Sequence, residues 1–204
     1  MNLLRTLATA HWLPGEPPPP LPGFSASAFN PLVAAVADRC LAVHYGEPAE
    51  PAEPGEPGEA GEPGAPGEPR RTGLLLASAG GDRATALAIE TAAAGHRMPP
   101  LLFFQSNPNA VLGHVAARWG LTGPVVAISL PEAASPGEVP PDALELAALL
   151  LADGDADQVL VITAEQAEPT GRTTGEPGAA GGPDHATADH ATAVLVTTDR
   201  ASTA

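Results

Sequence analysis

The chain has 204 residues, a single cysteine, no lysine and a net charge of −15 at pH 7. An acidic surface argues against nucleic acids and anionic membranes as partners. One cysteine allows no internal disulfide, which fits a reducing cytoplasm, and no apolar run approaches the roughly 20 residues of a membrane span. We therefore expect one cytoplasmic domain over residues 1–204.

The N-terminal part predicts a strand and a helix. Leu3–Leu13 is apolar enough for a first strand, and the prolines that follow exclude regular structure. Asn30 then has the character of an N-cap with Pro31 at the first helical position, which predicts a helix from Pro31 to His44. Cys40 lies on the apolar face of this helix, so we expect a buried structural thiol.

Residues 46–70 differ in composition from their surroundings. Seven glutamates lie between Glu47 and Glu68, where no basic residue occurs, and glycine recurs every third residue from Gly55 to Gly67. This pattern predicts a disordered, solvated insertion of polyproline-II character. It would separate two parts of one domain, and the rest of the chain remains acidic.

A strand, a tight turn and a helix are expected after the insertion. Thr72–Ser78 is a short apolar run that suits a buried strand, and Asp82 is the expected N-cap of a helix that ends at Ala94 before Gly95. A Gly-Gly joint between strand and helix could cradle a phosphate. The complete glycine fingerprints of phosphate loops are missing, so a tight turn is the preferred interpretation.

Pro99–Leu130 contains the densest apolar run and the best-capped helix. Asn107 and Pro108 predict a helix start, Val111, Leu112, Val115 and Trp119 mark one helical face, and Gly120 closes the helix. A Leu-Thr-Gly-Pro turn leads into Val125–Leu130, which we expect to be a buried strand.

The last third predicts a helix and two strands. Asp142 is the expected N-cap of a well-buried helix over Ala143–Ala152, Gln158–Thr163 is a β-branched strand, and Ala193–Thr198 is a last strand. Residues 167–191 are Gly- and Thr-rich and predict a flexible loop. Because no helix is predicted between the last two strands, an antiparallel hairpin with a long loop is an option for them. Alternating strands and helices predict an α/β fold with a mostly parallel mixed sheet of about five strands, flanked by helices.

The stretches FFQSNPNAVLGHVAARWGLTGPVVAIS and DALELAALLLADGDADQVLVITAE resemble the β-ketoacyl synthases, most closely stand-alone proteins similar to the N-terminal half of this thiolase-like fold. The resemblance covers about Phe24–Glu165 apart from the insertion. It implies an interface strand made of Val125, Val126, Ala127 and Ile128. It also implies a homodimer or a heteromer with a full-length ketosynthase, with an acyl carrier protein as a further candidate partner, and no cofactor.

The nucleophile of that family is missing. The resemblance places its cysteine eight residues after Pro124, where this chain has Glu132, and both family histidines belong to a second half that this chain does not contain. This favours a catalytically inactive accessory protein in polyketide or fatty-acid-type biosynthesis over an enzyme. The alternative is a small acyl-thioester enzyme, a decarboxylase or acyltransferase, that uses Glu132, Ser129 or Ser135.

Three further histidines invite a chemical interpretation. Asp184-His185-Ala-Thr and Asp189-His190-Ala-Thr form a five-residue repeat, and His185 with His190 could contribute to a metal site. The surrounding loop is not expected to be preorganised, so no metal is assigned. His114, inside the central helix, is expected to be a packing or surface residue.

Overall fold

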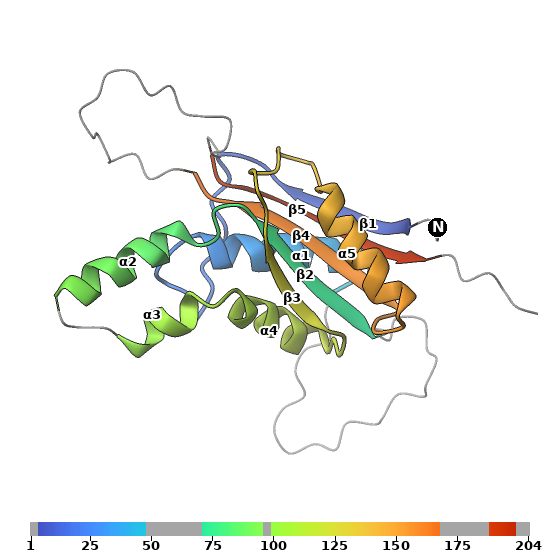
Figure 1. The fold of residues 1–204 in the computed structure, drawn as a ribbon, viewed down its shortest axis with the longest axis horizontal. Coiled ribbons are helices and arrows are strands. Elements are labelled where there is room, and N and C mark those ends of the chain that lie inside the picture. Colours follow the sequence, from blue (N-terminus) through green and yellow to red (C-terminus); the bar gives the residue numbers. More distant parts are fainter. Residues whose placement is uncertain (1–3, 48–70, 96–98, 168–187, 199–204) are drawn as a thin grey trace, which may run out of the picture.

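The computed structural model describes residues 4–47, 71–95, 99–167 and 188–198. In chain order, the elements are β1 (Leu4–Trp12), α1 (Phe29–Tyr45), β2 (Thr72–Ser78), α2 (Arg83–Ala94), α3 (Pro100–Gln105), α4 (Pro108–Trp119), β3 (Val125–Ser129), α5 (Pro141–Ala152), β4 (Gln158–Glu165) and β5 (His190–Thr198). Figure 1 shows the described strands side by side in one twisted sheet with helices on both faces. The α/β fold expected from the sequence is confirmed.

The described strands form a mixed sheet in the order β1-β5-β4-β2-β3. The central strand β2 pairs in parallel with β3 on one side and β4 on the other. The last strand, β5, lies antiparallel between β4 and β1. The expected antiparallel last strand is therefore confirmed, and the parallel half of the sheet brings the carboxyl ends of β2, β3 and β4 to one edge.

Alternation along the strands divides the core between the two faces. Leu74, Leu76 and Ile162 belong to a core shared with α1 and α4, whereas Leu75 and Val161 belong to a core shared with α5. Two helices cover the first face and one covers the second, as Figure 1 also shows. Cys40 is completely buried in the first core, so the expected structural thiol is confirmed.

The start of α1 differs from the expectation. The helix begins at Phe29 with Ala28 as its N-cap and no capping side chain, so the prediction that Asn30 caps the helix is wrong. Asn30 lies in the first turn and is 2% exposed. Its side chain donates hydrogen bonds to Asp82 and to the backbone of Gln105 instead. These long-range hydrogen bonds of the buried Asn30 amide therefore outweigh the local preference of asparagine for the N-cap position.

The central stretch folds largely as expected. Asn107 caps α4 by accepting a hydrogen bond from Asn109 N, and Gly120 ends it in the left-handed conformation at φ +63°. The turn after α4 then passes very close to β2. A Cβ on Gly123 would lie 2.4 Å from the carbonyl carbon and oxygen of Thr72, so this position tolerates only glycine without a shift of the backbone. The short helix α3, which precedes α4, was not predicted.

Two burial predictions are wrong. The strand β3 was expected to be buried, but residues 125–128 are half-buried and Ser129 is exposed, because β3 has a strand neighbour on one side only among the described residues. The helix α5 was also expected to be well buried. Its buried residues are Ala143, Ala147 and Leu151, while Leu149 is 58% exposed, because only one face of the helix packs against the sheet.

The boundaries of α5 and β5 also differ. Asp142 was expected to be the N-cap, but α5 begins at Pro141, Pro140 is the N-cap, and no side chain caps the helix. The strand β5 begins at His190, within the predicted loop and before the predicted start at Ala193. The remainder of that loop, residues 168–187, and almost all of the predicted insertion lie outside the described residues. Among the described helices, none combines the length and apolarity needed to span a membrane.

Candidate ligand cavity and interface strand

A cavity of about 220 Å³ opens where β2 and β3 end and α3 and α4 meet. Its apolar wall includes Phe29, Leu76, Ala127 and Ile128. Its polar wall includes Asn30, Ser78, Asp82, Gln105, Ser106 and Ser129. The parallel pairing explains this composition. Ser78 and Ser129 are register partners at the carboxyl ends of neighbouring strands, and such ends form the usual ligand crevice of α/β sheets.

The turn between β2 and α2 is closed by a carboxylate from β4. Glu165 is 1% exposed, and it accepts hydrogen bonds from Ala79 N at 2.8 Å and from Gly80 N at 3.4 Å. The next amide, Gly81 N, donates to Ser78 Oγ at 2.8 Å, and Gly81 has a positive φ of 59°. The amides that a phosphate would need are thus already bound within the chain. This supports the tight-turn interpretation over phosphate binding.

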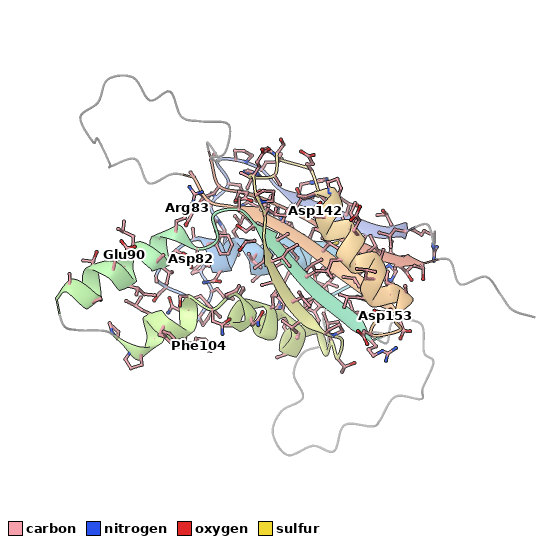
Figure 2. The ribbon with its side chains drawn as sticks, in the orientation of Figure 1. Asp82, Arg83, Glu90, Phe104, Asp142 and Asp153 are labelled. Carbon is pink, nitrogen blue, oxygen red and sulfur yellow. The ribbon has the colours of Figure 1, made fainter. Side chains whose placement is uncertain are left out.

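A polar chain links this turn to α1 and α3. Asp82 caps α2 by accepting from Thr85 N at 2.9 Å, and its second oxygen accepts from Asn30 Nδ2 at 3.0 Å. The same Asn30 nitrogen donates to Gln105 O at 3.0 Å, and Gln105 Oε1 accepts from Ala26 N at 2.9 Å. Figure 2 shows Asp82 at the start of α2. These bonds hold three helices around the cavity.

The loop between β3 and α5 is attached to the neighbouring strands. His190 Nε2 lies 2.8 Å from Ala134 O, Gly137 N donates to Thr192 Oγ1 at 3.1 Å, and Thr163 Oγ1 donates to Glu138 O at 3.1 Å. Strands β4 and β5 therefore fix the position of the segment in which the resemblance places the family's nucleophile.

The candidate catalytic side chains are not brought together. Ser129 lines the cavity at the end of β3, whereas Glu132 and Ser135 are exposed in the loop and do not line it. None of the residues that line the cavity is a histidine. The cavity therefore contains a hydroxyl but no imidazole that could activate it.

The candidate metal residues are likewise not assembled. His190 is buried, and its Nδ1 and Nε2 lie 2.9 Å from Ala188 O and 2.8 Å from Ala134 O, so both ring nitrogens face backbone carbonyls. His185 lies outside the described residues. The described part of the chain contains no group of three or more potential metal ligands.

Cys40 is remote from the cavity and is chemically unsuited to attack. It lies on α1, in the core, and its thiol is hydrogen-bonded to the backbone of Leu195. Burial raises the pKa of its thiol from 9.0 to about 11, against a smaller lowering effect of a hydrogen bond with the Leu195 backbone. At neutral pH the thiol is therefore protonated, and only the thiolate is an effective nucleophile.

Among the described strands, none pairs with the outer edge of β3. Leu74 N donates to Pro124 O, and Leu130 N donates to Ser78 O. Because hydrogen bonding to one neighbour alternates along a parallel strand, the backbone groups of Val126 and Ile128 face β2. Those of Val125 and Ala127 face away from the sheet. The residues expected to form the interface strand thus lie on an open edge.

Sequence reasoning missed three residues of the polar wall and turn. Asn30 was interpreted as a local cap, Gln105 ends an apolar run that gave no sign of a helix, and Glu165 ends an apolar strand. A glutamate at the end of such a strand is a signal for a buried, partnered carboxylate, because an unpaired one is costly to bury. The partners themselves were not visible, since they lie 52 to 87 residues away.

The structure resembles solved ketosynthase structures. One is "the ishigamide ketosynthase/chain length factor", with a TM-score of 0.59 and 19% identity over 90% of this chain and 47% of that chain. Another is a ketosynthase (ApeO) in complex with its chain length factor (ApeC) from Xenorhabdus doucetiae, with a TM-score of 0.63 and 15% identity over 98% of this chain and 81% of that chain. No protein-family model and no curated protein matches the sequence.

The lengths of the matched chains differ. This chain spans less than half of the first and most of the second, so it corresponds to a half-length unit of the first and is similar in length to the second. The expected thiolase-like half is thereby confirmed at the level of fold. The fold of this chain is similar to that of these ketosynthase structures.

Proposed function

We propose that this chain is a catalytically inactive, ketosynthase-like accessory subunit in polyketide or fatty-acid-type biosynthesis, and that it acts by associating with a ketosynthase. The observation that carries the proposal is the open edge of β3 in a ketosynthase-like fold. The matched structure from Xenorhabdus doucetiae, a ketosynthase in complex with its chain length factor, supports a partner of this kind.

The composition of the β3–α5 loop supports inactivity. Its position eight residues after Pro124 is occupied by Glu132, and the single cysteine of the sequence, Cys40, is buried in the core. Condensation through a thioester on the enzyme requires an accessible thiolate. A subunit without one would contribute to the complex through its surface rather than through bond formation.

Exposed apolar side chains supply further surface for association. On α3, Leu101, Phe103 and Phe104 are 51%, 73% and 53% exposed. Figure 2 shows Phe104 on the part of the molecule that extends beyond the strands. Apolar groups gathered in this way are typical of interaction sites, and a partner that pairs with β3 could cover them as well.

The charge of the chain bears on the choice of partner. Because the chain has a net charge of −15, a partner with a basic docking surface is favoured. Carrier proteins of this class are usually acidic, so we infer that an acyl carrier protein would be recruited through the ketosynthase rather than by this chain alone. The complex would work in the cytoplasm.

Co-expression with a ketosynthase encoded beside this chain's gene tests the association. We expect the two proteins to co-purify and to elute together in size-exclusion chromatography. The variant Ala127→Pro removes an N–H from the open edge only and should abolish co-elution while preserving the circular dichroism spectrum. Val126→Pro, the matched control, removes a bond to β2 and should unfold the sheet instead.

The outcomes separate the possible partners. A homodimer that Ala127→Pro converts to a monomer would assign the edge to self-association. A stable monomer that binds no ketosynthase, or a complex that Ala127→Pro leaves intact, would contradict the proposal.

One observation favours a second function, a small acyl-thioester enzyme. Ser129 lines the cavity, so an acyl group bound there would lie beside a hydroxyl. Turnover of a malonyl thioester by the purified chain, abolished in Ser129→Ala or Glu132→Ala and retained in Ser135→Ala, would support this function. Absence of turnover by the unmodified chain would remove it.

A further inference from the structure

Two buried side-chain amides at the cavity each have one polar atom without a hydrogen-bond partner in the described part of the chain. Asn30 donates twice through Nδ2, to a carboxylate and a carbonyl, which leaves Oδ1 as the free acceptor. Gln105 accepts a backbone hydrogen bond through Oε1, which leaves Nε2 as the free donor. Because these partners define which atom is oxygen and which is nitrogen, the assignment does not depend on an arbitrary amide orientation.

Both amide side chains border the cavity. Asn30 and Gln105 are only 2% and 1% exposed, and both line the cavity. No fully enclosed side-chain nitrogen or oxygen among the described residues lacks a partner, so each of these atoms must retain access to open space. The open space beside both residues is the cavity itself.

The walls and the size of the cavity restrict what it can hold. Phe29, Leu76, Ala127 and Ile128 add apolar surface to the lining that holds the amides. Its volume of about 220 Å³ is below the range of about 300–1,000 Å³ that is usual for drug-sized ligands. A cavity of this size suits one small organic molecule.

We propose that this cavity binds a small ligand with a carboxamide group and a short apolar tail. The carbonyl oxygen of the ligand would accept a hydrogen bond from Gln105 Nε2, its N–H would donate to Asn30 Oδ1, and its tail would lie against Phe29 and Ile128. An amide offers a donor and an acceptor side by side and carries no charge. This matches the free donor and the free acceptor, and it avoids both the desolvation of a charged ligand and the repulsion of an anion by the Asp82 carboxylate.

The proposal extends beyond association with a ketosynthase and does not depend on it, since all of its residues belong to this chain. The experiment therefore uses the full chain alone. Hexanamide is the probe, methyl hexanoate is a neutral analogue of similar shape that lacks the N–H, and titrations are followed through the backbone and side-chain amide signals of ¹⁵N-labelled protein. We expect hexanamide to shift the signals of Asn30 and Gln105 and to bind at least about fivefold more tightly than the ester.

Two variants and a matched control locate the site. Gln105→Met removes the donor and should weaken hexanamide binding about fivefold or more, while Gln166→Met is the control. Gln166 is also buried and also accepts one backbone hydrogen bond, from Ala84 N, but it does not line the cavity. Ala127→Leu fills the cavity without changing its polar atoms and should abolish binding, and thermal unfolding verifies that each variant is folded.

Three results would overturn the proposal. The first is that hexanamide leaves the Asn30 and Gln105 signals unchanged. The second is that the ester binds as tightly as the amide, which would mean that Asn30 Oδ1 does not select a ligand N–H. The third is that folded Ala127→Leu binds hexanamide as the unmodified chain does.

Discussion

Gly123 shows how a single position can be constrained by a segment far away in the sequence. Its backbone approaches Thr72 so closely that a Cβ would lie 2.4 Å from the carbonyl group, while Gly113, in α4, has nothing within 4 Å of such an atom. Both glycines belong to the stretch that carries the family resemblance. Their structural roles are nevertheless opposite, because only one of them meets another strand.

We therefore expect Gly123→Ala and Gly113→Ala to change stability in opposite directions. Gly123→Ala should lower the free energy of unfolding by about 1–3 kcal/mol, since the clash is with backbone and must displace the turn. Gly113→Ala should raise it by up to about 1 kcal/mol, since alanine favours the helix. Urea denaturation of the two variants provides the measurement, and a neutral Gly123→Ala would show that the turn can move away from β2.

Cys40 gives a pH dependence with a defined sign. The pKa of its thiol is about 11 in the folded chain, whereas the ordinary pKa of a cysteine thiol is 9.0. Below pH 9 the thiol is protonated in both the folded and the unfolded chain, so its contribution to the free energy of unfolding does not change with pH. Between pH 9 and 11 the unfolded chain loses the proton and the folded chain does not, so folding becomes less favourable as the pH rises, by up to about 2–3 kcal/mol.

This effect can be isolated by comparison with Cys40→Ala. Urea denaturation of both proteins from pH 7 to pH 11 should show stability curves that are parallel below pH 9 and converge above it, because the unmodified chain loses stability that the variant does not lose. All other titrating groups are common to the two proteins. Curves that remain parallel up to pH 11 would mean that the folded thiol ionises as readily as a free one.

At the scale of elements, two helices of equal length differ in how they are held. Helices α2 and α4 both have 12 residues. In α4, Val111, Leu112, Val115 and Trp119 are buried, whereas in α2 only Thr85 is. Figure 1 shows α2 and α3 extending away from the sheet. The stability of α2 therefore depends mainly on its Asp82 cap and on α3.

Hydrogen exchange should reflect this difference. We expect backbone amides in the middle of α2 to exchange at least about tenfold faster than those in the middle of α4, after correction for intrinsic rates, because α2 can open without exposing a core. Exchange measured by NMR on the chain alone tests this. Equal protection in the two helices would indicate that α2 is covered by a surface of the same or another chain.

At the scale of the whole molecule, the two ends of the acidic insertion meet. Tyr45, the last residue of α1, lies within hydrogen-bond distance of Thr72, the first residue of β2, with 3.3 Å between the hydroxyl oxygens. The residues between them, 48–70, lie outside the described part. We propose, as expected from their composition, that they form a disordered insertion that the fold does not require.

Replacing residues 48–70 by a short Gly/Ser linker tests this proposal. The linker has to span only the short distance between the end of α1 and the start of β2. A shorter loop also lowers the entropic cost of bringing these two ends together. We therefore expect a cooperative transition with a Tm equal to that of the full chain or slightly higher, measured by calorimetry. A Gly/Ser segment of the original length is the control for the removal of charge. Loss of cooperative unfolding in the shortened chain alone would show that the insertion contributes to the fold.

The sequence by itself determined most of the elements, because their signals are local. The Asp82 and Asn107 caps, the left-handed Gly120 and the β-branched run of β4 act within a few residues, and all of them appear in the structure as expected. The short helix α3 was missed because its apolar run has neither a capping residue nor enough length to reveal a helical period.

The tertiary structure alone decided the site. The edge position of β3 depends on the order of strands, and the cavity depends on where α3 meets the ends of β2 and β3. Asn30 and Glu165 act on partners 52 to 87 residues away. A hydrogen bond over such a distance leaves no local pattern, since the free energy of burying a polar group depends on the partner that the fold brings to it.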